Sequence, residues 1–116
     1  MKLSKREREG AVLVDVEGKF VGSPENSDVF HSFFKSLLSE GWKKVVVNLD
    51  ESPWANSQGI GMLIGAHTSF ANAGGELVLA RVTPRIYDIL TVTRLLLIFK
   101  TFETEDEALA HLSARD

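Results

Sequence analysis

The sequence predicts a single α/β domain built on a mixed but mostly parallel β-sheet, and three observations carry this prediction. Apolar runs rich in β-branched residues, which are typical of strands, alternate with segments whose apolar residues recur at three-and-four spacing, which is typical of helices. Such alternation favours parallel strands joined by right-handed crossovers. The length of 116 residues suffices for one core and not for two. We therefore expect one domain over residues 1–116, with about four helices.

The N-terminal region contains the first predicted strand, Ala11–Val16, which reads AVLVDV. Gly10 could turn the chain back from a short strand at Leu3–Glu7, and this hairpin would add antiparallel pairing at one edge of the sheet. The alternative for Lys5–Glu9 is a frayed polar tail. Both interpretations are compatible with the charged sequence of this segment.

The first helix is predicted over Pro24–Glu40. Ser23 is a suitable N-cap, Pro24 suits the first helical position, and Gly41 is a typical left-handed end. Its apolar face is expected to hold Val29, Phe30, Phe33, Phe34, Leu37 and Leu38.

A buried strand is predicted next, at Val45–Leu49, because its apolar run is nearly continuous. The loop Asp50–Asn56 leads into a second helix, Ser57–Ala73, which Gly74 and Gly75 end. The core-facing residues of this helix are expected to be Ile60, Leu63, Ile64, His67, Phe70 and Ala71.

The C-terminal region begins with a strand at Leu77–Ala80. A third helix is predicted over Pro84–Thr93, with Ile86, Ile89, Leu90 and Thr93 facing inward. Leu95–Phe99 reads as a loop that turns into a short strand. A capping box at Thr104–Glu107 then starts the last helix, Glu105–Ala114.

The composition excludes several classes of protein. The chain has no cysteine, so disulfides, thiolate catalysis and the usual zinc sites are excluded. Its net charge of −3 does not favour nucleic acid as a partner. The charged N-terminus does not resemble a signal peptide, and no apolar run could span a membrane. We expect a cytoplasmic protein with no cofactor, no metal site and no membrane association.

The glycine-rich stretch Gly59–Gly65, GIGMLIG, does not fit a nucleotide-binding loop. A dinucleotide fingerprint needs Gly-x-Gly-x-x-Gly directly after a strand, and here the last gap is one residue too long. The structural interpretation is therefore preferred.

Ser57 allows three interpretations: a helix cap, a catalytic nucleophile or a site of modification. As a cap, it competes with Asn56, since both residue types are common there. As a nucleophile, it would need a nearby base. His67 lies too far along the same helix, and His31 and His111 are on other helices. A small serine hydrolase is thus disfavoured, and His67 is expected to be a partly buried core residue.

The helix that follows Ser57 contains no Asp, Glu, Lys or Arg, which is unusual in a chain with 25% charged residues. Gly61 and Gly65 lie on its predicted outer face, although glycine inside a helix costs about 1 kcal/mol relative to alanine. They fit a surface that another protein approaches closely, and the alternative is that they let a neighbouring loop pack. The outer face is predicted to carry Gln58, Gly61, Met62, Gly65, Thr68, Ser69 and Asn72.

A phosphate on Ser57 would lie at the helix N-terminus, where the backbone N–H groups and the helix dipole favour an anion. It would also add about two negative charges beside an uncharged face and could release a bound partner. The sequence thus suggests a binding module with a one-residue switch.

The chain resembles the STAS domain, the fold of bacterial anti-sigma factor antagonists. The resemblance covers nearly the whole chain and is densest over Val45–Phe99, including the serine–glycine turn, the bend at Ala73–Glu76 and the ending Leu90–Phe99. It implies a non-enzymatic protein that binds an anti-sigma factor with serine kinase activity. Phosphorylation of Ser57 by that kinase would end the binding, and a serine phosphatase would restore it.

The resemblance also places Gly59, Gly61 and Leu63 on the glycines and leucine that follow the family's serine. The family's aspartate before the serine is Asn56 here. A neutral amide would accept the Ser57 hydroxyl hydrogen bond less strongly than a carboxylate, which predicts slow phosphorylation. The predicted partner-binding residues are Asn56, Gln58, Gly59, Gly61, Met62, Gly65 and Ser69. An alternative is a docking subunit of a transport or signalling-scaffold complex, without a phosphorylation cycle.

Overall fold

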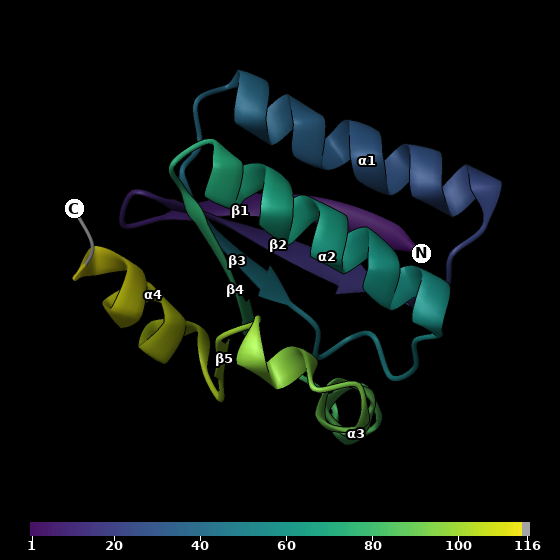
Figure 1. Cartoon of the computed structure of the whole chain (residues 1–116). Coiled ribbons are helices and arrows are strands. Elements are labelled where there is room, and N and C mark those ends of the chain that lie inside the picture. The colour runs from purple at the N-terminus through teal and green to yellow at the C-terminus, as the bar shows by residue number, and fades with distance from the viewer. Residues whose placement is uncertain (115–116) are drawn as a thin grey trace.

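The computed structural model describes residues 1–114 as one five-stranded sheet with helices on both faces (Figure 1). The last two residues of the predicted domain lie outside this range. The elements in chain order are β1 (Lys2–Arg8), β2 (Ala11–Glu17), α1 (Pro24–Ser39), β3 (Lys44–Asn48), α2 (Ser57–Asn72), β4 (Glu76–Ala80), α3 (Pro84–Val92), the 3-10 turn η1 (Leu95–Leu97), β5 (Thr101–Phe102) and α4 (Glu105–Ser113). The predicted α/β class is confirmed, and each predicted helix ends within one residue of the observed one.

The strand order is β1-β2-β3-β4-β5, so each strand pairs with its neighbour in sequence. β1 and β2 are antiparallel, whereas the pairs from β2 to β5 are parallel. The hairpin interpretation of the N-terminus is therefore confirmed. Gly10 lies in its turn with a φ of 79°.

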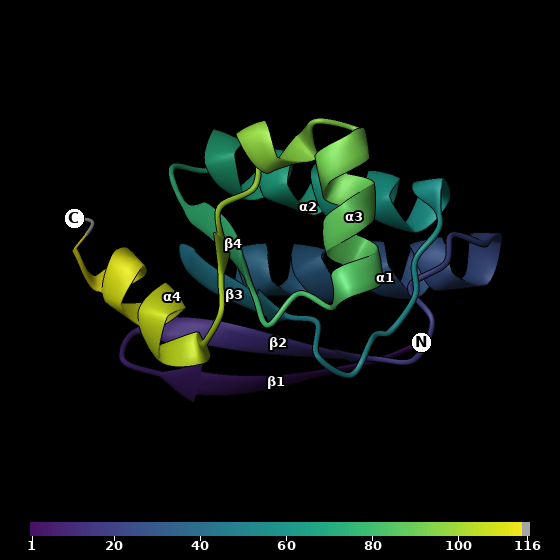
Figure 2. The same ribbon diagram turned by 90° about the horizontal axis from the view of Figure 1, so that it is seen from below.

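The two faces of the sheet bury different helices, because successive side chains of a strand point to opposite sides. Val14, Val47 and Leu79 belong to a core formed with α1, α2 and α3. Leu13, Val46 and Val78 belong to a smaller core under α4. Figure 2 shows α1 and α2 side by side over the sheet.

Several helices begin and end at the capping residues that the sequence predicts. The side chains of Ser23 and Thr104 accept hydrogen bonds from the backbone of Asn26 and Glu107. The Glu107 carboxylate accepts from the Thr104 hydroxyl rather than reaching its backbone. Gly41 and Gly74 adopt φ values of 90° and 82° just beyond α1 and α2.

Three residues expected on inner helix faces are exposed: Val29, Ala71 and Thr93. Val29 and Ala71 lie at the edges of their apolar stripes, where the helix surface has already turned from the sheet. Thr93 caps the end of α3, and its hydroxyl donates to the carbonyl of Ile89 at 2.6 Å.

The expectation of a strand at the end of Leu95–Phe99 is also wrong by two residues. The segment begins with η1, after Arg94 adopts a left-handed φ of 63°. The strand β5 starts only at Thr101, where the chain reaches Leu79 of β4.

Candidate functional site

The loop before α2 is held against the loop between β2 and α1. Ser52 is completely buried, and its hydroxyl donates to the carbonyl of Gly18 at 2.7 Å. The N–H of Phe20 donates to the carbonyl of Trp54 at 2.7 Å, and the N–H of Asn56 donates to the carbonyl of Phe20 at 3.2 Å. These bonds fix where α2 begins.

Asn56 is the N-cap of α2 and joins the two loops. Its Oδ1 accepts from the N–H of Gly59 at 2.8 Å and from the N–H of Gly22 at 3.1 Å. The expectation that this oxygen accepts the Ser57 hydroxyl is wrong, because the two backbone N–H groups use it instead. Asn56, rather than Ser57, is the cap.

The loop before α2 and the loop between β2 and α1 can approach each other closely because Gly59 and Gly22 have no side chains. A Cβ on Gly59 would overlap the carbonyl oxygen of Phe20, and a Cβ on Gly22 would overlap the Cβ of Gln58. Gly59 is buried as a result, so its predicted place on the partner-binding surface is wrong. No local pattern in the sequence indicates Gly22 or Phe20 as part of this region, because both lie far from Ser57 along the chain.

Ser57 is exposed at the first position of α2. Within residues 1–114, its hydroxyl and backbone N–H make no hydrogen bond, and the N–H of Gln58 is likewise unpaired. Unpaired N–H groups at a helix N-terminus favour a negative charge. The serine oxygen is therefore accessible next to a backbone that can bind a phosphate.

The outer face of α2 is open. A Cβ on Gly61 or on Gly65 would meet no atom within 4 Å, so neither glycine serves the packing of a neighbouring loop. Gln58 and Ser69 are also exposed, and Met62 is half-buried, with its sulfur 3.4 Å from the Ser27 hydroxyl. We call the exposed, uncharged residues Gln58, Gly61, Gly65, Thr68 and Ser69 the open face.

The histidines do not assemble a catalytic site with Ser57. His67 is half-buried and its ring packs edge-on against Phe99, with the centroids 5.1 Å apart. His111 pairs with Glu76 at 2.9 Å, on the other side of the sheet. Among residues 1–114, no group of three His, Cys, Asp or Glu side chains could hold a metal.

Charged side chains gather instead near the start of α4. Arg6 donates to both carboxylate oxygens of Asp15 at 2.7 and 2.8 Å and to Glu105 at 2.6 Å. The nearly buried Asn48 donates to Asp15 and Glu105 at 3.0 and 2.8 Å. The Arg6 hydrogen bond, and to a lesser degree that of Asn48, hold the pKa of Asp15 below its usual value. Arg6, Asp15 and Glu105 thus pair with one another, whereas Oδ1 of the buried Asn48 has no hydrogen-bond partner within residues 1–114.

Comparison with known proteins identifies the type of domain. The family model of the STAS domain matches residues 2–108. A proposed anti-sigma factor antagonist from Thermotoga neapolitana is 27% identical over 92 residues, which is 78% of this chain and 81% of the relative.

Two solved structures share the fold. The crystal structure of a proposed anti-sigma factor antagonist from Thermotoga maritima matches with a TM-score of 0.87 at 20% identity, over 96% of this chain and 94% of that one. The Bacillus cell fate determinant SpoIIAA in its phosphorylated form matches with a TM-score of 0.72 at 14% identity, over 95% of this chain and 98% of that one. At these identities the likeness concerns the fold alone. No described helix is long and apolar enough to cross a membrane.

Proposed function

The chain belongs to the STAS domain family, and on this premise we propose that it is an anti-sigma factor antagonist controlled by phosphorylation of Ser57. The partner is an anti-sigma factor that is also a serine kinase, and a serine phosphatase reverses the modification. A relative that is 27% identical over 92 residues is a proposed anti-sigma factor antagonist, which supports the general role.

One observation carries the proposal: an accessible serine begins a helix whose outer face is open and uncharged. Ser57 is exposed, and a Cβ on Gly61 or on Gly65 of the same helix would meet no atom within 4 Å. A partner can approach the α2 backbone closely at the glycines. A phosphate of about two negative charges at Ser57 opposes that contact without disturbing the fold.

Binding and modification are tested with the kinase-type anti-sigma factor encoded nearest to this gene. Gly65→Glu is expected to lower its affinity at least a hundredfold, because a buried and unpaired carboxylate is costly at an interface. Ala110→Glu, an exposed change on α4, is the matched control and should leave the affinity unchanged. Equal affinities for the two variants would contradict the assignment of the open face.

Phosphorylation is followed by mass spectrometry after incubation with the same kinase and ATP. One phosphate is expected on Ser57, and Ser57→Ala should remain unmodified while still binding. Phosphate on another residue, with Ser57→Ala fully modified, would reject Ser57 as the switch.

A docking subunit without a phosphorylation cycle is the second candidate. The arrangement of Asn56 favours it, because its oxygen is occupied by Gly22 and Gly59 and leaves Ser57 without an acceptor from this neighbour. Partner binding that requires the open face, with no phosphate on Ser57 in either the wild type or Asn56→Asp, would support this candidate.

A further inference from the structure

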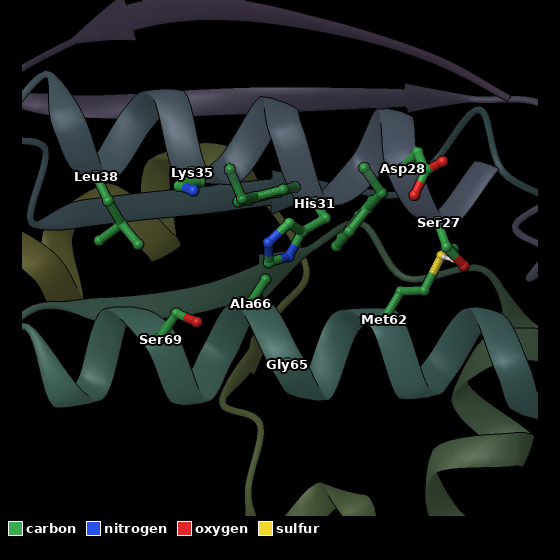
Figure 3. A pocket seen from close by; sticks show the side chains of 11 residues that line it. Ser27, Asp28, His31, Lys35, Leu38, Met62, Gly65, Ala66 and Ser69 are labelled. Carbon is green, nitrogen blue, oxygen red and sulfur yellow. Dashed lines mark hydrogen bonds between the residues drawn. The ribbon is translucent and has the colours of Figure 1, made fainter. Parts of the chain in front are cut away.

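A groove of about 570 Å³ runs between α1 and α2 (Figure 3). This volume lies in the range of roughly 300–1000 Å³ that is typical of small-molecule sites. The apolar part of its lining consists of Phe30, Phe34, Leu38, Met62 and Ala66. Phe30, Phe34 and Ala66 are at most 6% exposed and form the floor of the groove, whereas Leu38 and Met62 are half-buried.

The groove exists because the two helices contribute residues of unequal size. α1 presents Phe30 and Phe34, whereas α2 presents Gly65, Ala66 and Ser69. A Cβ on Gly65 would meet no atom within 4 Å, so the space beside it is empty of protein. A larger residue at position 65 would fill this space without displacing the core.

The two charged residues of the lining, Asp28 and Lys35, both belong to α1. α1 places Asp28, His31 and Lys35 along the groove, while α2 contains no charged residue. Within residues 1–114, none of these three side chains forms an ion pair. Figure 3 shows Asp28 near the Met62 end, Lys35 near the Leu38 end and the His31 ring between the two helices.

We propose that this groove binds an anionic amphiphile, a carboxylate with a medium-length alkyl chain. The carboxylate pairs with Lys35 at one end, and His31 offers a further donor beside it. The chain lies over the floor formed by Phe34 and Phe30, from Leu38 towards Met62. Ser27 and Lys35 are eight residues apart on α1, or about 12 Å, which is roughly the length of an extended ten-carbon chain.

The charge pattern selects this class of ligand. A carboxylate at Lys35 finds an unpaired cation with the His31 ring as a further hydrogen-bond donor, at the end of the groove away from Asp28, whereas a cationic amphiphile finds Asp28 without a second acceptor among the charged side chains. Gly65 and Ser69 belong to both the groove and the open face. A bound amphiphile therefore covers part of the partner surface, a consequence that, unlike the site itself, rests on the proposed function.

The test is isothermal titration calorimetry of the whole chain with decanoate below its micelle-forming concentration. The wild type should bind one decanoate. Gly65→Leu should weaken binding at least tenfold by filling the groove, and Lys35→Gln should weaken it about threefold to tenfold by removing the cation.

Two matched controls accompany these variants. Thr68→Leu places the same side chain on α2 outside the groove, and Lys2→Gln removes an exposed lysine on β1. Both should bind decanoate within twofold of the wild type. Circular dichroism confirms that each variant is folded.

Several results would overturn the proposal. They are the absence of saturable decanoate binding, equal affinity for Gly65→Leu, or tighter binding of decyltrimethylammonium than of decanoate. A dimer in sedimentation velocity that Gly65→Leu dissociates would identify a second copy of the chain as the occupant instead. None of these measurements involves the anti-sigma factor, so they fail independently of the proposed function.

Discussion

Helix α2 carries Gly59, Gly61 and Gly65 within two turns, and the surroundings of the first differ completely from those of the other two. A Cβ on Gly59 would overlap the carbonyl oxygen of Phe20, whereas a Cβ on Gly61 or Gly65 would meet nothing within 4 Å. The fold therefore requires Gly59 and does not require the others. Since each helical glycine costs about 1 kcal/mol relative to alanine, Gly61 and Gly65 point to a use outside the fold.

The same comparison extends to charge. The region near α4 uses Arg6, Asp15 and Glu105 in one hydrogen-bonded cluster, which ties β1 to the start of the helix. The open face of α2 has no charged group to pair. Charged groups that pair within the chain hold its elements together. A face without charged groups loses less solvation free energy when a partner covers it.

The largest expected effect is that of Gly59→Ala. The added methyl group displaces either the Phe20 backbone or the first turn of α2, and overpacking of this kind typically costs about 1–3 kcal/mol. We expect the free energy of unfolding to fall by about 2–3 kcal/mol in urea denaturation. Gly61→Ala, two residues further on, is the control and should not be destabilised. Equal stability of the two variants would break the distinction between packed and open glycines.

A smaller loss is expected for Asn56→Ala, which removes the acceptor shared by Gly22 and Gly59. The lost cap costs about 1 kcal/mol, and the unpaired, half-buried N–H of Gly22 costs about 1 kcal/mol more. We expect a total loss of about 2 kcal/mol in the same denaturation assay.

Asn56→Asp is the matched variant, because a carboxylate keeps both acceptor positions and suits a helix N-terminus. It should be at least as stable as the wild type. A large loss in Asn56→Asp would show that the amide group has a role besides accepting these two hydrogen bonds.

Local signals in the sequence predicted most of the fold and part of the site. Ser23, Thr104, Gly41 and Gly74 mark helix ends through interactions that span only a few residues, so their roles follow from residue type and spacing. The open face followed from the absence of charge in α2. Each of these features lies within one element.

The remaining features depend on contacts between segments that are distant in sequence. Gly59 and Gly61 are both glycines in the first turns of α2, and the sequence does not distinguish them. Only Gly59 lies against the Phe20 carbonyl, which is why the fold requires it and does not require Gly61. Asn56 and Ser57 are both candidate caps by residue type, and the bond that Asn56 also makes to Gly22 depends on how two loops meet. The groove was missed because His31 and Lys35 approach α2 only after both helices pack on the sheet.

The smallest expected effect on stability, and the one with opposite sign, is that of Gly65→Ala. Alanine has the higher helix propensity, and its methyl group meets no atom within 4 Å, so the free energy of unfolding should rise by about 0.5–1 kcal/mol.

If the open face docks a partner backbone closely, the same methyl group should weaken binding of the anti-sigma factor about tenfold, as measured by calorimetry. Ser32→Ala, an exposed change on α1 outside the open face and the groove, also gains helix propensity and is the control for binding. A Gly65→Ala protein that is more stable and binds as tightly as the wild type would show that the glycine serves no close contact. A Gly65→Ala protein that is more stable but binds more weakly would show that the interface, and not the fold, requires glycine at this position.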